Sequence, residues 1–146
     1  MIRSAHTDSF TRESLPPESQ LPQFLFDAPV PRYPKRLNAT VELLDRHVLA
    51  GRGDMIALRS DDAVCTYHQL YVRVNRIAHV LRNELKLVPG NRVLLRGPNN
   101  PMMAACWLGI VKAGLVAVAT MPLLRARELV PVMEKARVNA DRKSVV

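Results

Sequence analysis

The sequence is poor in aromatic residues, which make up 5% of its 146 residues. Proteins that bind single-stranded nucleic acid stack bases on aromatic side chains, and this sequence offers too few for such a platform. The formal net charge is +8, yet the lysines and arginines are scattered among acidic residues. We therefore expect no nucleic-acid partner, although a small, basic, non-catalytic nucleic-acid-binding module is kept as an alternative.

Cysteine is also scarce. Cys65 and Cys106 lie far apart in the sequence, so we expect two buried free thiols rather than metal ligands. The first twenty residues contain no apolar h-region, so we expect no secretory signal peptide. Together these features indicate a cytoplasmic protein.

Glycine is missing where a nucleotide-binding loop would need it. The sequence contains neither GxGxxG nor GxxxxGK(S/T), and its turn 97–101, "GPNNP", has one glycine and two prolines. Proline lacks the N–H group with which a backbone loop cradles phosphate, so we interpret this turn as part of the fold. The four histidines are widely separated: His6, His47, His68 and His79. From the residues alone we expect no metal site and no catalytic group.

The sequence does have a long apolar segment, residues 101–124, in which Lys112 is the one charged residue. A membrane-anchored protein that spans the bilayer with this segment is therefore a second alternative. However, Lys112 would lie mid-membrane, where a charge is costly. The composition also changes at Gly114, from helix-forming residues to "LVAVAT", which suits a buried strand. We expect a helix capped by Asn100 and ending at Ala113, then a strand, in a parallel strand–helix–strand unit without membrane association.

Proline is unevenly distributed, and residues 1–36 hold six of the eleven prolines. Because proline interrupts helices and central strands, this segment cannot form a long helix or an inner strand. We expect an extended, proline-rich N-terminal arm that is pinned to the surface by the apolar residues 24–26. For residues 1–20, a disordered tail is the alternative.

The hydrophobic pattern then becomes regular, and we expect residues 37–140 to form a partial α/β domain. Asn38 can cap a helix that continues to about Ala50 and buries a face formed by three apolar residues. These are Val41, Leu44 and Val48. The stretches "MIALRS" and "AVCTY" predict two short strands joined by a tight turn.

A capping-box pattern, Thr66 followed by Gln69, opens the next helix, which is amphipathic over about five turns. Pro89 and Gly90 end this helix, and "RVLLRG" follows as a strand. The stretch "RARELVPVMEKAR" indicates a last helix. Pro131 would have to lie in or near its first turn, because a proline ring obstructs the helix interior.

Two of these segments resemble the adenylate-forming enzymes, the superfamily of acyl-CoA synthetases, luciferases and peptide-synthetase adenylation domains. "TYHQL" is similar to the family's Thr-Tyr-x-x-Leu opening of a helix, and "GIVKAGLVAVATMPLL" to its Lys-Ala-Gly segment with the strand and Pro loop that follow. The more specific resemblance, from about Ser4 to Asn139, is to the aryl-CoA ligases, in particular the 2-aminobenzoate–CoA and benzoate–CoA ligases. Three stretches carry it: "SAHTDSFTRESLPP", "LVPGNRVLLRGPNNPMMAACWL" and "VAVATMPLLRAREL".

The resemblance implies a mostly parallel α/β fold, that of an incomplete N-terminal subdomain of an adenylate-forming ligase (AMP-dependent synthetase/ligase). The parent enzyme would use ATP with Mg²⁺ to convert an aromatic carboxylic acid into an acyl-adenylate, and then transfer the acyl group to coenzyme A. The resemblance favours 2-aminobenzoate over benzoate as that acid.

The resemblance places one functional region in this chain, the loop after "VAVAT", which lies near the nucleotide end of coenzyme A in some relatives. Its candidate residues are Met121, Pro122, Leu123 and Arg125; the alternative is that they only turn the chain. The family's Ser/Thr/Gly-rich phosphate loop and its catalytic lysine have no counterpart here. We therefore expect the 146-residue chain to bind no cofactor and to be inactive.

The last six residues, "DRKSVV", follow the point at which the resemblance stops. This hexapeptide is the translation of the start of a common sequencing adapter, whereas a doubly wound sheet would begin another strand there. We therefore expect residues 141–146 to be no part of the natural protein.

Sequencing the genomic locus across codon 140 tests this expectation. We expect a reading frame that continues into a Ser/Thr/Gly-rich phosphate loop and a distal lysine. Finding the six codons for 141–146 in the genome, away from the end of a sequencing read, would show that the tail is natural.

Overall fold

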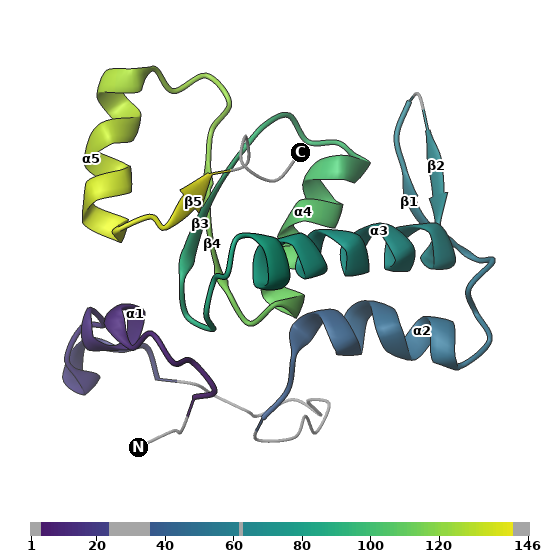
Figure 1. Cartoon of the computed structure of the whole chain (residues 1–146), viewed down its shortest axis with the longest axis horizontal. Coiled ribbons are helices and arrows are strands. Elements are labelled where there is room, and N and C mark those ends of the chain that lie inside the picture. The colour runs from purple at the N-terminus through teal and green to yellow at the C-terminus, as the bar shows by residue number, and fades with distance from the viewer. Residues whose placement is uncertain (1–3, 24–35, 62, 142–146) are drawn as a thin grey trace.

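The computed structural model describes residues 4–23, 36–61 and 63–141. These residues form a three-stranded parallel sheet in the order β4-β3-β5 and a separate antiparallel hairpin, β1-β2. Helices α3 and α4 lie on one side of the larger sheet and α5 lies on the other (Figure 1). The strands are β1 (Ile56–Arg59), β2 (Val64–Thr66), β3 (Arg92–Arg96), β4 (Val116–Thr120) and β5 (Ala140–Asp141). The helices are α1 (Phe10–Glu13), α2 (Arg46–Leu49), α3 (Tyr67–His79), α4 (Pro101–Lys112) and α5 (Ala126–Ala136).

The predicted strand–helix–strand unit is present as β3-α4-β4. The Asn100 side chain accepts a hydrogen bond from the Met103 backbone N–H at 2.9 Å, with Pro101 in the first turn, and so begins α4. Gly114 follows the helix at φ +75°, a conformation that favours glycine. Contrary to the prediction, β4 is only partly buried, because it is the edge strand of the sheet.

The hairpin β1-β2 and the capping box that opens α3 are confirmed. Gln69 N–H donates to the Thr66 hydroxyl at 3.3 Å, and the Gln69 side chain accepts from Thr66 N–H at 2.9 Å. The helix continues as a π-helical segment, Val80–Glu84, and Lys86 then adopts φ 54°. It therefore ends before Pro89 and Gly90, which instead form the turn into β3.

The helix predicted from Asn38 forms, but of the three residues predicted on its buried face only Leu44 is buried, and Val48 is half-buried. Asn38 Oδ1 accepts from Thr40 N–H at 3.0 Å, and Leu44 is buried as predicted. Val41, however, is 36% exposed, because Val41–Asp45 is π-helical and its wider turn rotates the apolar face away from the spacing of an α-helix. α2 continues from this segment.

Pro131 lies deeper in α5 than predicted. It is the sixth residue of the helix. Because proline has no backbone N–H, the carbonyl oxygen of Arg127, four residues earlier, receives no helical hydrogen bond. No described residue of α5 is buried, and water can hydrogen-bond the freed carbonyl. The exposed position explains why the helix tolerates a proline there.

The N-terminal arm was predicted to be extended, but its described part contains the short helix α1 and a 3-10 turn, Glu18–Gln20. The alternative of a disordered tail is wrong around Thr7 and Asp8, whose backbone N–H groups both donate to the Pro89 carbonyl at 2.9 Å. The predicted anchor at 24–26 lies outside the described residues.

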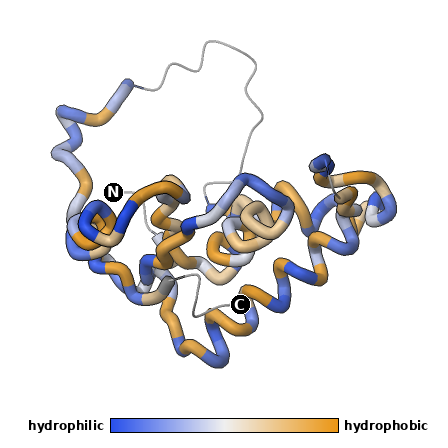
Figure 2. Tube along the Cα trace, turned by 90° about the horizontal axis from the view of Figure 1, so that it is seen from above, coloured by the Kyte–Doolittle hydropathy of each residue, from blue (hydrophilic) through white to orange (hydrophobic). Residues whose placement is uncertain are grey.

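The core lies between the sheet and the pair α3-α4. Its buried side chains come from both helices, from the π-helical segment that continues α3 and from β3, and include Leu70, Val74, Leu81, Val93, Leu95, Cys106 and Ile110. In the hydropathy-coloured trace, apolar residues gather in the central elements, while apolar and polar residues alternate along the outer helices (Figure 2). Within the described part of the chain, no helix has the length and apolar character to span a membrane; the segment proposed as a span is divided between α4 and β4.

Gly109 sets the separation of α3 and α4, and this generates a stability prediction. A Cβ atom there would lie 2.6 Å from Ile77 Cγ2 and 2.9 Å from Ile77 Cβ. We expect Gly109→Ala to lower the free energy of unfolding by about 1–3 kcal/mol, since the overpacking outweighs the helix propensity gained. Denaturant unfolding would measure the change.

Gly53→Ala is the matched control, because its Cβ would lie 3.4 Å from the Cβ of His68, an ordinary contact. We expect the control to unfold close to the wild type. Combining Gly109→Ala with Ile77→Ala should give a smaller loss than the sum of the single changes. Equal midpoints for Gly109→Ala and the wild type would show that the helices adjust freely.

Candidate functional site

The carboxyl ends of β3 and β4 form the candidate site. From β3 the chain enters α4 on one side of the sheet, and from β4 it leaves toward α5 on the other (Figure 1). Parallel sheets bind ligands in the crevice that opens where neighbouring connections diverge in this way. A cleft of about 790 Å³ lies at this point.

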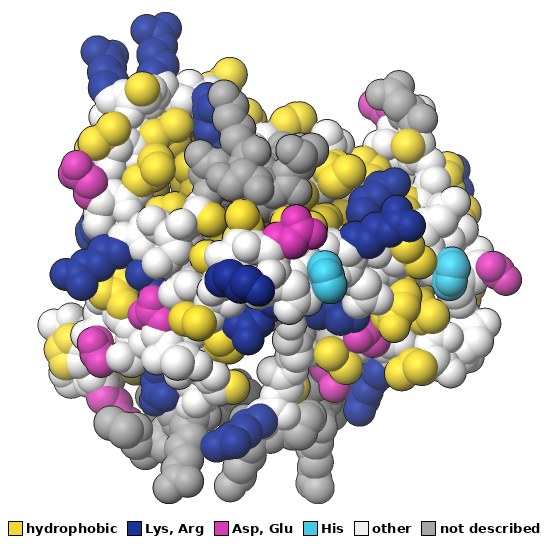
Figure 3. All heavy atoms as spheres, viewed as in Figure 1, with side chains coloured by type: hydrophobic (Ala, Val, Ile, Leu, Met, Phe, Trp, Pro, Cys, Tyr) yellow, Lys and Arg dark blue, Asp and Glu magenta, His cyan; other side chains and the backbone are white. Residues whose placement is uncertain are grey.

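The cleft has mostly apolar walls. Its lining comes from β1, the end of β3, the 97–101 turn, the first turns of α4 and the end of β4, and includes Leu58, Leu95, Met103, Trp107 and Met121. The polar lining residues include Arg59, Asn99, Asn100 and Thr120. Such a surface can bind the apolar part of a ligand, and Arg59 can attract an anion to it. Figure 3 shows apolar side chains at the surface near the hairpin and beside α5.

Thr120 brings an unsatisfied polar atom to this cleft. Its hydroxyl oxygen is buried and has no hydrogen-bond partner among the described residues. Most buried polar atoms are hydrogen-bonded, so an unpartnered hydroxyl in a cleft wall is a candidate contact for a ligand.

The four predicted site residues divide into two pairs. Met121 and Pro122 line the cleft. Leu123 is not among its lining residues and is 83% exposed, and Arg125 stands before α5, where its backbone N–H donates to Glu128 Oε2 at 2.8 Å. The structure thus brings half of the predicted set to one cavity.

Sequence reasoning missed two contributions to this edge. The 97–101 turn, interpreted as part of the fold, also lines the cleft. Arg96, the last residue of β3, donates through Nη2 to the carbonyl oxygens of Pro122 at 2.6 Å and Leu124 at 2.8 Å. A strand-terminal arginine carries no sequence signal for such a contact, which depends on the register between β3 and β4.

Other chemically versatile residues do not assemble into a site. His68 and His79 are exposed on α3, and the His47 ring stacks on Tyr67 with centroids 4.5 Å apart. Cys65 and Cys106 are both buried, and neither forms a disulfide in the described part of the chain, as predicted. Across residues 4–23, 36–61 and 63–141, no group of three or more His, Cys, Asp or Glu could hold a metal ion.

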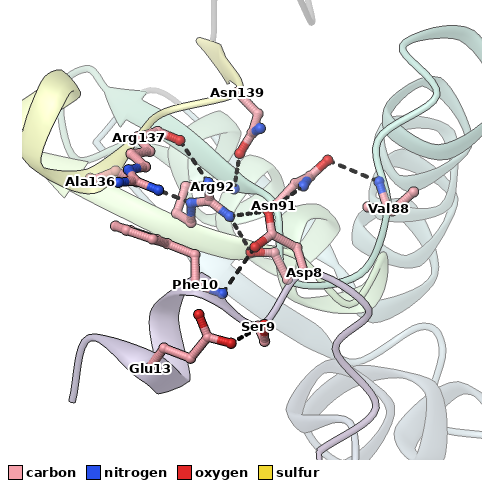
Figure 4. Close-up of polar contacts among 11 residues, drawn as sticks. Asp8, Ser9, Phe10, Glu13, Val88, Asn91, Arg92, Ala136, Arg137 and Asn139 are labelled. Atoms are coloured by element: carbon pink, nitrogen blue, oxygen red, sulfur yellow. Dashed lines mark hydrogen bonds and ion pairs between the residues drawn. The ribbon is translucent and has the colours of Figure 1, made fainter.

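A polar cluster at the opposite end of the sheet centres on Arg92 (Figure 4). The Arg92 side chain is 6% exposed and forms an ion pair with Asp8. It also donates to the Ala136 carbonyl at 3.0 Å and the Arg137 carbonyl at 2.9 Å. The Phe10 ring packs against the guanidinium groups of Arg92 and Arg137. Its centroid lies 4.8 Å from Arg92 Cζ and 4.7 Å from Arg137 Cζ.

The pKa of Asp8 lies below its ordinary value of 3.8, chiefly because Arg92 donates to its carboxylate and also because the Phe10 backbone N–H does so. Shifted pKa values often mark functional sites. Here, however, the Asp8 oxygens are occupied by Arg92, by Phe10 and by Asn91, whose side chain donates at 2.8 Å. The cluster therefore fastens the N-terminal segment to β3 and to the end of α5, away from the cleft.

A sequence profile of the AMP-binding enzyme family matches residues 44–140, more than half of the chain. This chain belongs to the AMP-binding enzyme family. The match covers the hairpin, α3, the parallel sheet and α5, and so includes every wall of the cleft.

Individual family members agree with this assignment. The benzoate–CoA ligase of Thauera aromatica is 38% identical over 96 residues, which are 66% of this chain and 18% of that protein. A benzoate CoA ligase from Burkholderia xenovorans superposes with a TM-score of 0.65 at 25% identity, over 73% of this chain and 21% of its own. The anthranilate CoA ligase AuaEII, solved with anthranoyl-AMP, gives a TM-score of 0.63 at 27% identity, over 68% and 19% of the two chains.

The predicted fold is thereby confirmed: the chain has the fold of the N-terminal region of adenylate-forming ligases, with small sheets that match an incomplete subdomain. It spans about a fifth of the length of these relatives.

The Asp8–Arg92 ion pair generates a pH-dependent prediction. The pKa of Asp8 is lower in the folded state than its ordinary value of 3.8. The charged carboxylate therefore stabilises the fold above pH 3.8, and this stabilisation is lost as the pH falls through the pKa of the folded state. We expect Asp8→Asn to lower Tm at neutral pH, and the difference from the wild type to shrink as the pH falls below 3.8. Thermal unfolding followed by circular dichroism measures both.

Asp54→Asn provides the control, since Asp54 is exposed and lies far from the cluster in sequence. Its Tm should stay close to that of the wild type throughout the pH range. A loss in Asp8→Asn that stays constant at every pH would mean that the charge of Asp8 does not stabilise the fold.

Proposed function

We propose that this chain is part of an ATP-dependent aryl-CoA ligase, which converts an aromatic carboxylic acid to its acyl-adenylate and then to the coenzyme A thioester. One observation carries the proposal: the cleft at the carboxyl ends of β3 and β4 lies within the region that matches the AMP-binding enzyme family. The place where a parallel sheet usually binds its ligand thus lies within the residues that match the family.

The relatives support an aromatic acid as substrate. Those compared above are named benzoate–CoA ligase and anthranilate CoA ligase, and anthranilate is 2-aminobenzoate. Acetyl-coenzyme A synthetase, at 34% identity over 116 residues, and long-chain-fatty-acid–CoA ligases, at 33% over 103 residues and 42% over 66 residues, also match, so the support for an aromatic acid comes from the benzoate–CoA ligase match over 96 residues and from the two superposed structures. We favour 2-aminobenzoate, with benzoate second, because the quoted sequence stretches resemble the 2-aminobenzoate subgroup.

The described residues do not fit ATP with Mg²⁺. They include no acidic cluster for the metal, and the 97–101 turn contains two prolines where a phosphate loop needs backbone donors. We therefore assign no step of the adenylation to this chain. In the proposed enzyme, the groups that bind the triphosphate belong to other parts of the polypeptide.

Coenzyme A fits the loop 121–125 better. Met121 and Leu123 are 64% and 83% exposed, and so offer apolar surface to an adenine ring. Arg125 adds a guanidinium, a group suited to phosphate recognition. We propose that these residues, with Pro122 in the cleft wall, receive the nucleotide end of coenzyme A.

The 146-residue chain should not catalyse adenylate formation by itself. We expect ATP–pyrophosphate exchange at the background rate with either 2-aminobenzoate or benzoate, although circular dichroism and a cooperative unfolding transition should show a folded chain. Exchange that depends on acid and on chain concentration would contradict the proposal. A full-length benzoate–CoA ligase assayed in parallel controls for the reagents.

A full-length parent tests the substrate. We expect it to form adenylate and thioester with both acids, and to have the higher kcat/KM for 2-aminobenzoate. A parent that prefers acetate or a long-chain fatty acid would place the chain in another branch of the family.

A further inference from the structure

Arg96 links the end of β3 to the loop that follows β4. The two strands are in register there, with Arg96 opposite Thr120, so the arginine side chain starts beside the last residue before the loop. Its Nη2 atom lies 2.6 Å from the Pro122 carbonyl oxygen and 2.8 Å from that of Leu124. Two carbonyl groups of one short loop therefore converge on a single nitrogen atom.

Among the described residues, the contacts of Arg125 with the start of α5 fix the end of the loop, and residues 121–124 have few other hydrogen bonds. The turn bond from Leu124 N–H to the Met121 carbonyl is 3.3 Å long, and the Met121 and Leu123 side chains are mostly exposed. Holding a loop in one conformation costs conformational entropy, which apolar burial does not offset here. Hydrogen bonds from a charged donor are stronger than neutral ones, so the Arg96 contacts are well suited to define the conformation.

We propose that Arg96 is a positioning residue, which holds the loop 121–125 in the conformation that receives the nucleotide end of coenzyme A. The inference rests on the proposed function. Arg96 acts through the backbone of the loop, so it needs no contact with the reacting atoms.

Arg82 supplies a matched control within the same chain. Its Nη1 atom donates to the Leu87 carbonyl at 2.6 Å, which is also an arginine–carbonyl contact with a loop. Leu87 precedes β3, whereas Pro122 follows β4, so the two contacts lie at opposite ends of the parallel sheet. Arg82→Met removes the same type of bond far from the cleft.

The first measurement is amide hydrogen exchange on the 146-residue chain. In Arg96→Met we expect the amide of Leu124, whose N–H donates to the Met121 carbonyl, to lose about tenfold or more in protection, as the loss of a charged hydrogen bond that holds the loop implies. Protection in α3 and α4 should be unchanged. Arg82→Met should leave the loop amides as in the wild type, and unchanged loop protection in Arg96→Met would overturn the proposal.

The second measurement separates positioning from general stability in the full-length parent. We expect Arg96→Met to raise KM for coenzyme A by about tenfold, through the same bond, with ATP–pyrophosphate exchange within about twofold of the wild type. Arg96→Lys, which keeps the charge but loses the planar donor, should give a smaller rise in KM. Equal losses in pyrophosphate exchange and thioester formation would show a structural role only and overturn the proposal.

The wild-type parent distinguishes the two levels of inference. If it forms adenylate but no coenzyme A thioester, the proposed function is wrong, and with it the role of the loop. If it forms the thioester and Arg96→Met leaves KM for coenzyme A unchanged, the proposed function stands and the positioning role of Arg96 is wrong.

Discussion

The parallel sheet depends on a buried cation at its base. The Arg92 guanidinium bonds to the last carbonyl groups of α5 and to the carboxylate of Asp8, and so joins three segments that are distant in the sequence. Carbonyl groups at a helix C-terminus carry partial negative charge, which makes them suitable partners for a cation. The contact leads the chain into β5 beside β3, where Ala140 pairs with Val93. No described residue of α5 is buried, so these hydrogen bonds at its C-terminal end help to hold the helix on the sheet.

β3 connects this base of the sheet to the edge that carries the cleft. Val93, Leu94 and Leu95 are buried, and an arginine stands at each end of the strand. Arg92 closes the base, while Arg96 at the other end bonds to the loop after β4. A five-residue strand with a buried centre is a rigid spacer, so the position of the loop depends on contacts that also fix α5.

The sequence predicted what local chemistry decides. The capping box at Thr66 and Gln69, the α4 start at Asn100 and the glycine after that helix follow from neighbouring residues, and they proved correct. The errors arose where the helix departs from regular α-helical geometry or where exposure decides: a π-helical turn exposes Val41, and an exposed helix surface tolerates Pro131. The site follows the same rule. Met121 and Pro122 were identified through resemblance, whereas the role of Arg96 depends on strand register, which a single sequence does not encode locally.

The cleft and the loop share one edge of the sheet, and their chemistry differs from that of a reactive centre. Apolar walls, an unpaired Thr120 hydroxyl and arginine donors can bind and orient a ligand. Arginine remains charged, and a threonine hydroxyl needs an adjacent base to become a nucleophile. No His, Asp or Glu lines this cleft among the described residues. The part of the ligase fold described here is therefore suited to holding a substrate, and proton transfer and phosphate chemistry require residues supplied by other parts of the proposed enzyme.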